Sequence, residues 1–149
     1  MTSKSRPPIG PDDVVGVWAL DGMVRQDAET GELDPTAFSA NPIGYLIYTP
    51  GGHMSAFTEH GDGRSALKPD HVSAPDADKA RAMETVISYC GRYRVQNGAV
   101  IHIVDVSWDP AYHGQEHVRH ATLEDDRLTL YRAPADGHAG WYIHWRRVE

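Results

Sequence analysis

Histidine, tyrosine and arginine side chains in the second half of the chain have the types and spacing needed for acid–base chemistry. The chain has nine histidines, and six of them follow residue 100. A histidine exchanges protons near neutral pH, a tyrosine hydroxyl can donate to a carbonyl or enolate oxygen, and an arginine stabilises developing negative charge. His102, Tyr93 and Arg119 together would suit the dehydration or cyclisation of a β-hydroxy-ketone. The alternative interpretation is structural, with His102 and Tyr93 forming a hydrogen-bonded pair that fixes the interior of the fold.

Asp105 is a fourth catalytic candidate because it stands within a run of apolar residues. A buried carboxylate must be paired or protonated. Asp105 is therefore interpreted as a general base, as a partner that orients a histidine, or as an outward residue in contact with solvent.

A metal site and a bound cofactor are not expected. His113, His117 and His120 are the closest histidine group. On a strand, His113 and His117 would be about 13 Å apart at ~3.3 Å per residue, and His120 would face away. Zinc ligands must converge on one ion at about 2 Å. No phosphate-loop, dinucleotide-binding or nucleophile-elbow pattern occurs.

Strand-length runs joined by turn signals must position these side chains. The clearest is the Asn97-Gly98 hairpin signal between two alternating runs. A helix is expected after Ser73, which could cap it, with Pro75 in its first turn and an end near Thr85. Residues 21–40 are expected to be a long, irregular connection. The predicted strands are 14–20, 44–49, 53–58, 87–95, 99–108, 115–123, 127–132 and 141–147.

About eight strands and one short helix predict an all-β, up-and-down antiparallel barrel. Unpaired strand edges are a liability that closure removes, and barrels of this size can hold one small ligand. A β-sandwich is the alternative. We expect residues 1–12 to be a flexible tail and residues 13–149 to be a single domain.

Alternation along the strands predicts which side chains face inward. Tyr89 and Tyr93 are expected inside because the opposite face of their strand carries two arginines. His117 and Arg119 share a face that ends in apolar residues, so they are also expected inside. A single β-bulge would invert such an assignment. The remaining expected contacts with a ligand are Trp145, in an apolar triple of the last strand, and Tyr48, Met54 and Phe57, which flank the Pro50–Gly52 turn.

Several segments, in order, resemble the bacterial and fungal lipocalin-like domain family. They include Gly-Val-Trp-Ala-Leu at 16–20, the run 41–56 with its Tyr-Thr-Pro-Gly-Gly-His-Met turn, Tyr-Cys-Gly-Arg-Tyr at 89–93 and the closing Trp-Arg at 145–146. The resemblance implies a lipocalin-like barrel with a ligand cavity, and it implies that His102 and Trp108 point into that cavity. Some relatives resemble dehydratases or cyclases of natural-product pathways.

Composition narrows the class of protein. The chain has 149 residues and a formal net charge of −7, which argues against a nucleic-acid partner. No apolar run reaches the ~18 residues of a membrane span, so no membrane partner is expected. A single cysteine, Cys90, excludes an intrachain disulfide and suits the cytoplasm. A homodimer is possible.

Three functions remain open. The leading hypothesis is a cytoplasmic, cofactor-independent dehydratase or cyclase that acts on a polyketide-like, oxygenated substrate. The alternative is a non-catalytic protein that binds a small hydrophobic ligand. The third is a module that aids a partner enzyme and has no pocket of consequence.

Overall fold

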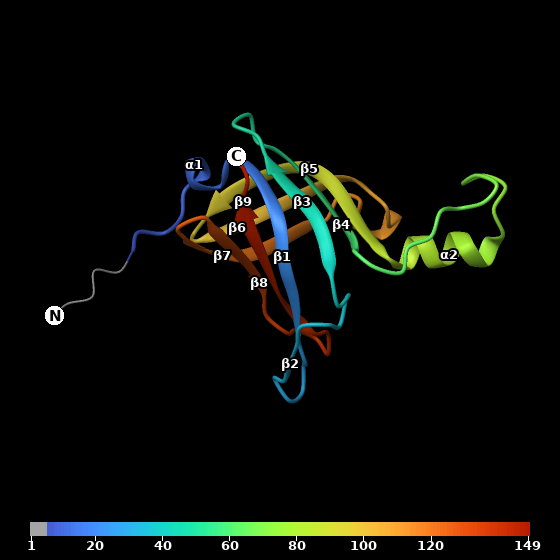
Figure 1. Ribbon diagram of the computed structural model, residues 1–149. Helices are drawn as coiled ribbons and strands as arrows, with labels where there is room; N and C mark the ends of the chain where they lie inside the picture. Colours follow the sequence, from blue (N-terminus) through green and yellow to red (C-terminus); the bar gives the residue numbers. More distant parts are fainter. Residues whose placement is uncertain (1–5) are drawn as a thin grey trace.

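A closed antiparallel β-barrel dominates the computed structural model, which describes residues 6–149 (Figure 1). The strand order is β2-β1-β3-β4-β5-β6-β7-β8-β9, and the pairing of β1 with β9 closes the barrel, which leaves β2 as a short addition beside β1. The predicted up-and-down barrel is therefore confirmed, and the β-sandwich alternative is wrong. The strands are β1 (Gly16–Gln26), β2 (Leu33–Asp34), β3 (Pro42–Tyr48), β4 (His53–His60), β5 (Val86–Gln96), β6 (Ala99–Ser107), β7 (Glu116–Glu124), β8 (Arg127–Arg132) and β9 (Gly140–Arg147).

A β-bulge lets β1 run further than the sequence predicted. Leu20 pairs with Trp145 and Gly22 with His144, so Asp21 is an extra residue in the ladder. Its insertion changes which face the following side chains occupy. Trp18 and Met23 are both buried, although their positions differ by an odd number. The expected irregular connection from residue 21 is therefore strand as far as Gln26.

The predicted helix forms as α2 (Asp76–Glu84), but Ser73 does not cap it. The position before the helix is Pro75, which makes no capping hydrogen bond through its side chain. Ser73 belongs to the preceding turn, where its backbone N–H donates to the Asp70 carboxylate at 2.7 Å. No α2 side chain is buried, and the helix projects away from the end of the barrel (Figure 1).

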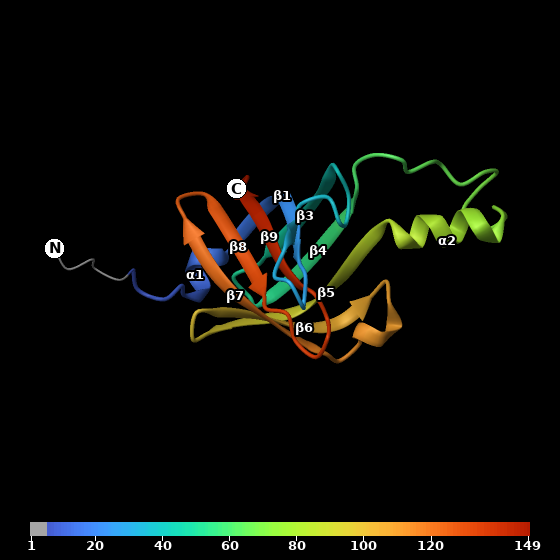
Figure 2. The same ribbon diagram turned by 90° about the horizontal axis from the view of Figure 1, so that it is seen from below.

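The N-terminal segment covers the opposite end of the barrel. Residues 1–5 of the expected tail lie outside the described residues, but Pro11–Val14 form the short helix α1 and Ile9 packs against the core. Trp18 Nε1 donates to the Val14 carbonyl at 2.9 Å, and the Arg147 guanidinium lies 4.2 Å from the centre of the Trp18 ring. Figure 2 shows α1 and α2 at opposite ends of the molecule.

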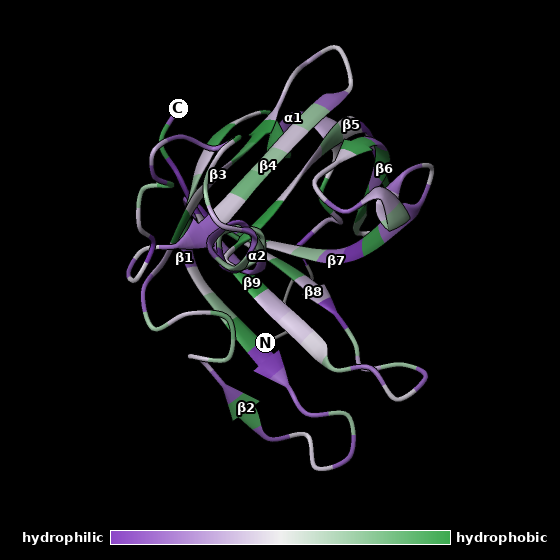
Figure 3. Cartoon of the chain, turned by 90° about the vertical axis from the view of Figure 1, so that its right-hand side faces the viewer, coloured by the Kyte–Doolittle hydropathy of each residue, from purple (hydrophilic) through white to green (hydrophobic). Residues whose placement is uncertain are grey.

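The core fills the barrel at the α1 end. The fully buried side chains there include Val14, Trp18, Tyr48, Val100 and Leu128. Figure 3 looks along the barrel from the other end, with the strands forming a ring behind α2. A ligand cavity therefore has to lie toward the α2 end.

Candidate functional site

The barrel interior holds a cavity of about 200 Å³ toward the α2 end. Most of its wall is apolar, and the longest polar side chains that line it are Tyr89, Tyr112, Arg119 and Arg132. The other lining residues are Met23, Phe38, Ala56, Thr58, Ile87, Trp141, Ile143 and Trp145. Cavities of this kind, apolar with a few convergent polar groups, are typical small-molecule sites.

A tyrosine–histidine–tyrosine chain runs from the cavity wall, at Tyr89, into the buried interior. The Tyr48 hydroxyl lies 2.6 Å from His102 Nε2, and the Tyr89 hydroxyl lies 2.8 Å from His102 Nδ1. Strands β3, β5 and β6 contribute one member each. His102 is only 2% exposed, so both of its ring nitrogens are already engaged and neither is open to a ligand.

The direction of these hydrogen bonds follows from burial. Tyr48 is fully buried, and its only side-chain partner within residues 6–149 is His102. A buried hydroxyl proton without an acceptor is costly, so Tyr48 donates to Nε2. A neutral imidazole carries one N–H, and therefore Nδ1–H donates to the Tyr89 oxygen. This arrangement leaves the Tyr89 hydroxyl proton free to turn toward the cavity.

Burial keeps this chain neutral. Desolvation, with smaller contributions from the Arg119 cation and His117, lowers the pKa of His102 to about 3. Desolvation also raises the pKa of Tyr48 and of Tyr89 above its usual value. At neutral pH the three side chains therefore carry no charge.

The depressed pKa of His102 predicts a loss of stability in mild acid. The unfolded chain takes up a proton on this histidine below pH ~6.5, whereas the folded chain resists it until about pH 3. The stability that neutral His102 contributes is therefore fully present when the pH is above the pKa of this residue in the unfolded chain. It decreases as the pH falls below that value. Between pH 7 and pH 5 we expect the free energy of unfolding to fall by about 2 kcal/mol from this residue. Urea unfolding of the wild type and of His102→Gln at several pH values measures this change, because the variant lacks the contribution of His102. If the free energy of unfolding depends equally on pH in both proteins, the prediction is wrong.

Arg119 and His117 stand next to each other on the inner face of β7. Arg119 Nη2 donates to His117 Nδ1 at 3.2 Å, so the ring proton of neutral His117 is on Nε2. Burial, together with the Arg119 and Arg132 cations, lowers the pKa of His117 to about 4. The His117 ring stacks on Tyr89, with ring centres 5.7 Å apart.

Some of the candidate site residues predicted from the sequence lie together at the cavity. Tyr89, Arg119 and Trp145 line it, with His102 and Tyr48 directly behind Tyr89. Met54 is buried in the core cluster rather than in the cavity wall. Tyr93 is also in that cluster, and its hydroxyl donates to the Thr49 carbonyl at 2.7 Å. Tyr93 therefore does not form the expected hydrogen bond with His102.

Three further candidates also lie outside the cavity lining. Asp105 is the extra residue of a second bulge, since Cys90 pairs with Val106 and Gly91 with Val104. Its exposed carboxylate accepts from Arg92 at 3.2 Å, so it is the outward, solvated residue. The same bulge inverts the face of the following residues, and Trp108 packs on Tyr112 instead of joining His102. Phe57 lies on the outer face of β4 and is 49% exposed.

The sequence did not predict a role in the site for Arg132 and Tyr112, two of the long polar side chains that line the cavity. Arg132 ends β8, where alternation from the buried Leu128 and Leu130 places it on the inner face; that pattern could have identified it. Tyr112 belongs to the 3₁₀ helix η1 (Pro110–Tyr112). Strand alternation does not extend into such a helix, so no sequence pattern identified Tyr112.

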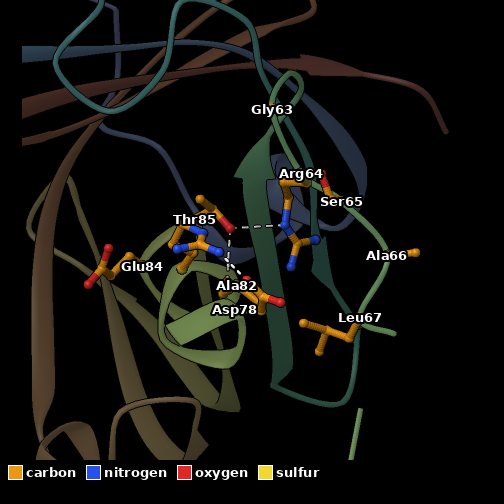
Figure 4. A pocket seen from close by; sticks show the side chains of 10 residues that line it. Gly63, Arg64, Ser65, Ala66, Leu67, Asp78, Ala82, Glu84 and Thr85 are labelled. Carbon is orange, nitrogen blue, oxygen red and sulfur yellow. Dashed lines mark hydrogen bonds and ion pairs between the residues drawn. The ribbon is translucent and has the colours of Figure 1, made fainter. Parts of the chain in front are cut away.

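A second hollow lies outside the barrel, between the 63–67 segment and α2 (Figure 4). Its two arginines are already satisfied. Arg64 pairs with Glu59 and donates to Thr85 Oγ1 at 3.0 Å, and Arg81 pairs with Asp78. The cations of the barrel cavity differ from these because no carboxylate of residues 6–149 lines that cavity.

Comparison with known proteins identifies the fold. The family model of the lipocalin-like domain matches residues 15–148. Similar solved structures are the lipoprotein YedD from Klebsiella pneumoniae subsp. pneumoniae (12% identity, TM-score 0.44, 98% of this chain and 80% of that chain) and a redesigned β-barrel (11%, 0.47, 97% and 100%). A third is the fluorescent protein UnaG (15%, 0.42, 92% and 98%). No curated protein matches. Among the described residues, no helix is long and apolar enough to cross a membrane.

Proposed function

Because this chain belongs to the lipocalin-like domain family, we propose that it binds a small, largely apolar, oxygenated molecule inside its barrel. The observation that carries this proposal is the cavity itself, where apolar walls surround the tips of Tyr89 and Arg119. An apolar ligand gains by leaving water, and a few fixed polar groups select its orientation. The packed core at the α1 end acts as the floor of the site.

Intrinsic fluorescence offers a direct test, because Trp141 and Trp145 line the cavity. We expect aryl and alkyl compounds that carry a carbonyl, hydroxyl or carboxyl group to change the tryptophan emission saturably, at one molecule per chain. Isothermal titration calorimetry checks the stoichiometry. If no compound of the panel binds saturably, the proposal is overturned.

A second candidate function is cofactor-independent dehydration or cyclisation of a polyketide-like substrate. The observation in its favour is the Tyr89 hydroxyl, which faces the cavity near the Arg119 cation while His102 lies 2.8 Å behind it. In the dehydration of a β-hydroxy-ketone, the bond to the β-hydroxyl and the C–H bond next to the carbonyl would break together as the C=C bond forms. Tyr89 would give its proton to the departing hydroxyl group, which leaves as water, and its oxygen would take the proton next to the carbonyl. His102 Nδ1–H would stabilise the negative charge on the Tyr89 oxygen, and Arg119 the charge that develops on the carbonyl oxygen.

For this second candidate we expect Tyr89→Phe to reduce turnover at least ~10²-fold, the usual contribution of an acid–base group. The assay follows the absorbance of the enone formed from a β-hydroxy aryl ketone. Tyr142→Phe is the matched control, because Tyr142 stacks on Tyr131 away from the cavity lining. Equal turnover by Tyr89→Phe and the wild type would rule out a catalytic role for Tyr89. If the wild type shows no turnover, the catalytic function itself is ruled out.

A further inference from the structure

We propose that the ligand of this cavity is an apolar molecule that carries a carboxylate. Arg119 and the Trp145 indole N–H bind this carboxylate. The inference rests on the ligand-binding function proposed above and names the class of ligand. Four features of the cavity wall support it: unpaired cations, unpaired N–H donors, the sign of the local charge, and the apolar surroundings.

The two cavity arginines have no acidic partner. Among residues 6–149, the side-chain hydrogen bonds of Arg119 go to the Val118 carbonyl and to His117 Nδ1, each at 3.2 Å. Arg132 donates to the Ala139 carbonyl at 2.8 Å. By contrast, Arg92 and Arg94 on the outer face of β5 each pair with a carboxylate. Residues 1–5, Met-Thr-Ser-Lys-Ser, contain no carboxylate side chain either.

A partly buried cation without a counter-charge has lost some of its hydration, and this cost falls when an anion binds beside it. Burial is the main reason why the pKa of Arg119 is lowered from its usual value, and the Arg132 cation lowers it further. An arginine nevertheless keeps its charge at neutral pH. Binding of a negatively charged group next to Arg119 is therefore expected to be favourable.

Two buried N–H groups also lack partners in the described part of the chain. They are Trp145 Nε1 and His117 Nε2. Trp145 is 3% exposed and lines the cavity, and His117 stacks on Tyr89, which lines it too. Buried donors are nearly always satisfied in folded proteins, so an acceptor supplied by a ligand accounts for the Trp145 donor.

The charge of the cavity is opposite to the charge of the whole chain. The formal net charge is −7, whereas the charged side chains of residues 6–149 that line the cavity are those of Arg119 and Arg132, with no aspartate or glutamate. General attraction of anions by the protein surface therefore does not explain these arginines. The local arrangement selects an anion at one place inside the barrel.

A carboxylate fits this arrangement better than a larger inorganic anion. The planar fork of a guanidinium matches the two oxygens of a carboxylate. The surrounding wall is made of Ile87, Trp141, Ile143 and similar side chains, which gain from contact with an apolar body. An aryl or alkyl carboxylic acid presents both parts.

The test compares three ligands of one shape: 4-phenylbutyrate, 4-phenylbutan-1-ol and 4-phenylbutylammonium. We expect the wild type to bind the acid at least ~10-fold more tightly than the alcohol and to bind the ammonium least, by calorimetry at fixed ionic strength. Arg119→Met should weaken acid binding by about 10- to 100-fold and leave alcohol binding nearly unchanged, the scale of a hydrogen bond to a charged group. Arg119→Lys keeps the charge but lacks the planar guanidinium. Its affinity for the acid should lie between those of the wild type and Arg119→Met. Thermal unfolding confirms that the variants fold.

Arg92→Met is the matched control, because it changes the net charge equally but removes an arginine from the outer face. It should leave the preference for the acid intact. Equal affinity of the wild type for acid and alcohol would overturn the carboxylate inference while the binding function stands. Loss of the preference in Arg92→Met as well would also overturn it, because the effect would then come from net charge. If none of the three compounds binds, both the inference and the proposed function fail.

Discussion

Replacing His102 with leucine is expected to lower the free energy of unfolding by about 3–5 kcal/mol. The imidazole joins two hydroxyl groups, with Tyr48 at 2.6 Å and Tyr89 at 2.8 Å. Leucine removes both bonds at once and leaves the fully buried Tyr48 hydroxyl without a partner. Each buried polar group that loses its partner costs about 1–3 kcal/mol, and the altered shape adds a packing cost. Equilibrium urea unfolding at pH 7 measures the change.

Two further variants show whether the hydrogen bonds are the cause. His120→Leu makes the same replacement at an exposed position of β7 and should change stability by less than ~0.5 kcal/mol. In the Tyr48→Phe background, His102→Leu should cost less than it does in the wild type, because one orphaned hydroxyl is already absent. A coupling free energy of about 1–3 kcal/mol is expected between the two positions. If His102→Leu lowers the free energy of unfolding by less than about 1 kcal/mol, the hydrogen bonds of His102 do not stabilise the fold as proposed.

The strands could be predicted from the sequence because period-two alternation and turn residues are local signals. Asn97-Gly98 joins β5 and β6 as expected, and Asn97 has the positive φ of 51° that this turn requires. The same alternation led us to expect Tyr89 and Arg119 on the inner face, where the structure has them. These features depend on residues that are close together in the chain.

Other features of the site depend on bulges and on contacts between distant segments. One inserted residue, Asp105, moved Trp108 away from the face of His102. The partner of His102 was expected to be Tyr93, its neighbour across the β5–β6 ladder. In the closed barrel its partners are instead Tyr89 and Tyr48, and Tyr48 is 54 residues earlier in the chain. Only the way the barrel closes brings β3 and β6 within reach across the interior, and no local pattern encodes that distance.

The two halves of the barrel interior therefore serve different purposes. At the α1 end the neutral Tyr48–His102 pair is satisfied by its own hydrogen bonds, and it sits in a tightly packed core. Toward the α2 end, polar tips remain unsatisfied: the Arg119 guanidinium has no carboxylate, and Trp145 Nε1 has no acceptor within residues 6–149. Polar groups that have no structural partner are the ones available to a ligand.

Filling the cavity from its wall should abolish binding while the barrel remains folded. Ala56 lines the cavity, and it pairs with Leu46 on one side and with Tyr89 on the other. The phenyl ring of Ala56→Phe would occupy much of the roughly 200 Å³ available and would stand against Tyr89. We expect ligand affinity to fall at least ~10³-fold, about 4 kcal/mol, because the apolar body of the ligand loses its place. Calorimetry with the tightest ligand of the wild type measures the loss.

Ser55→Phe is the matched control for this prediction. Ser55 is the neighbouring residue of β4, and it is exposed on the outer face. The same ring added there should leave affinity unchanged within about twofold, since it does not enter the barrel. Overpacking can cost about 1–3 kcal/mol of stability, so thermal unfolding accompanies both variants, and Ile143→Trp fills the cavity from β9 if Ala56→Phe fails to fold. If a folded, cavity-filled variant still binds as tightly as the wild type, the ligand binds elsewhere, because a ligand and a side chain cannot occupy the same volume.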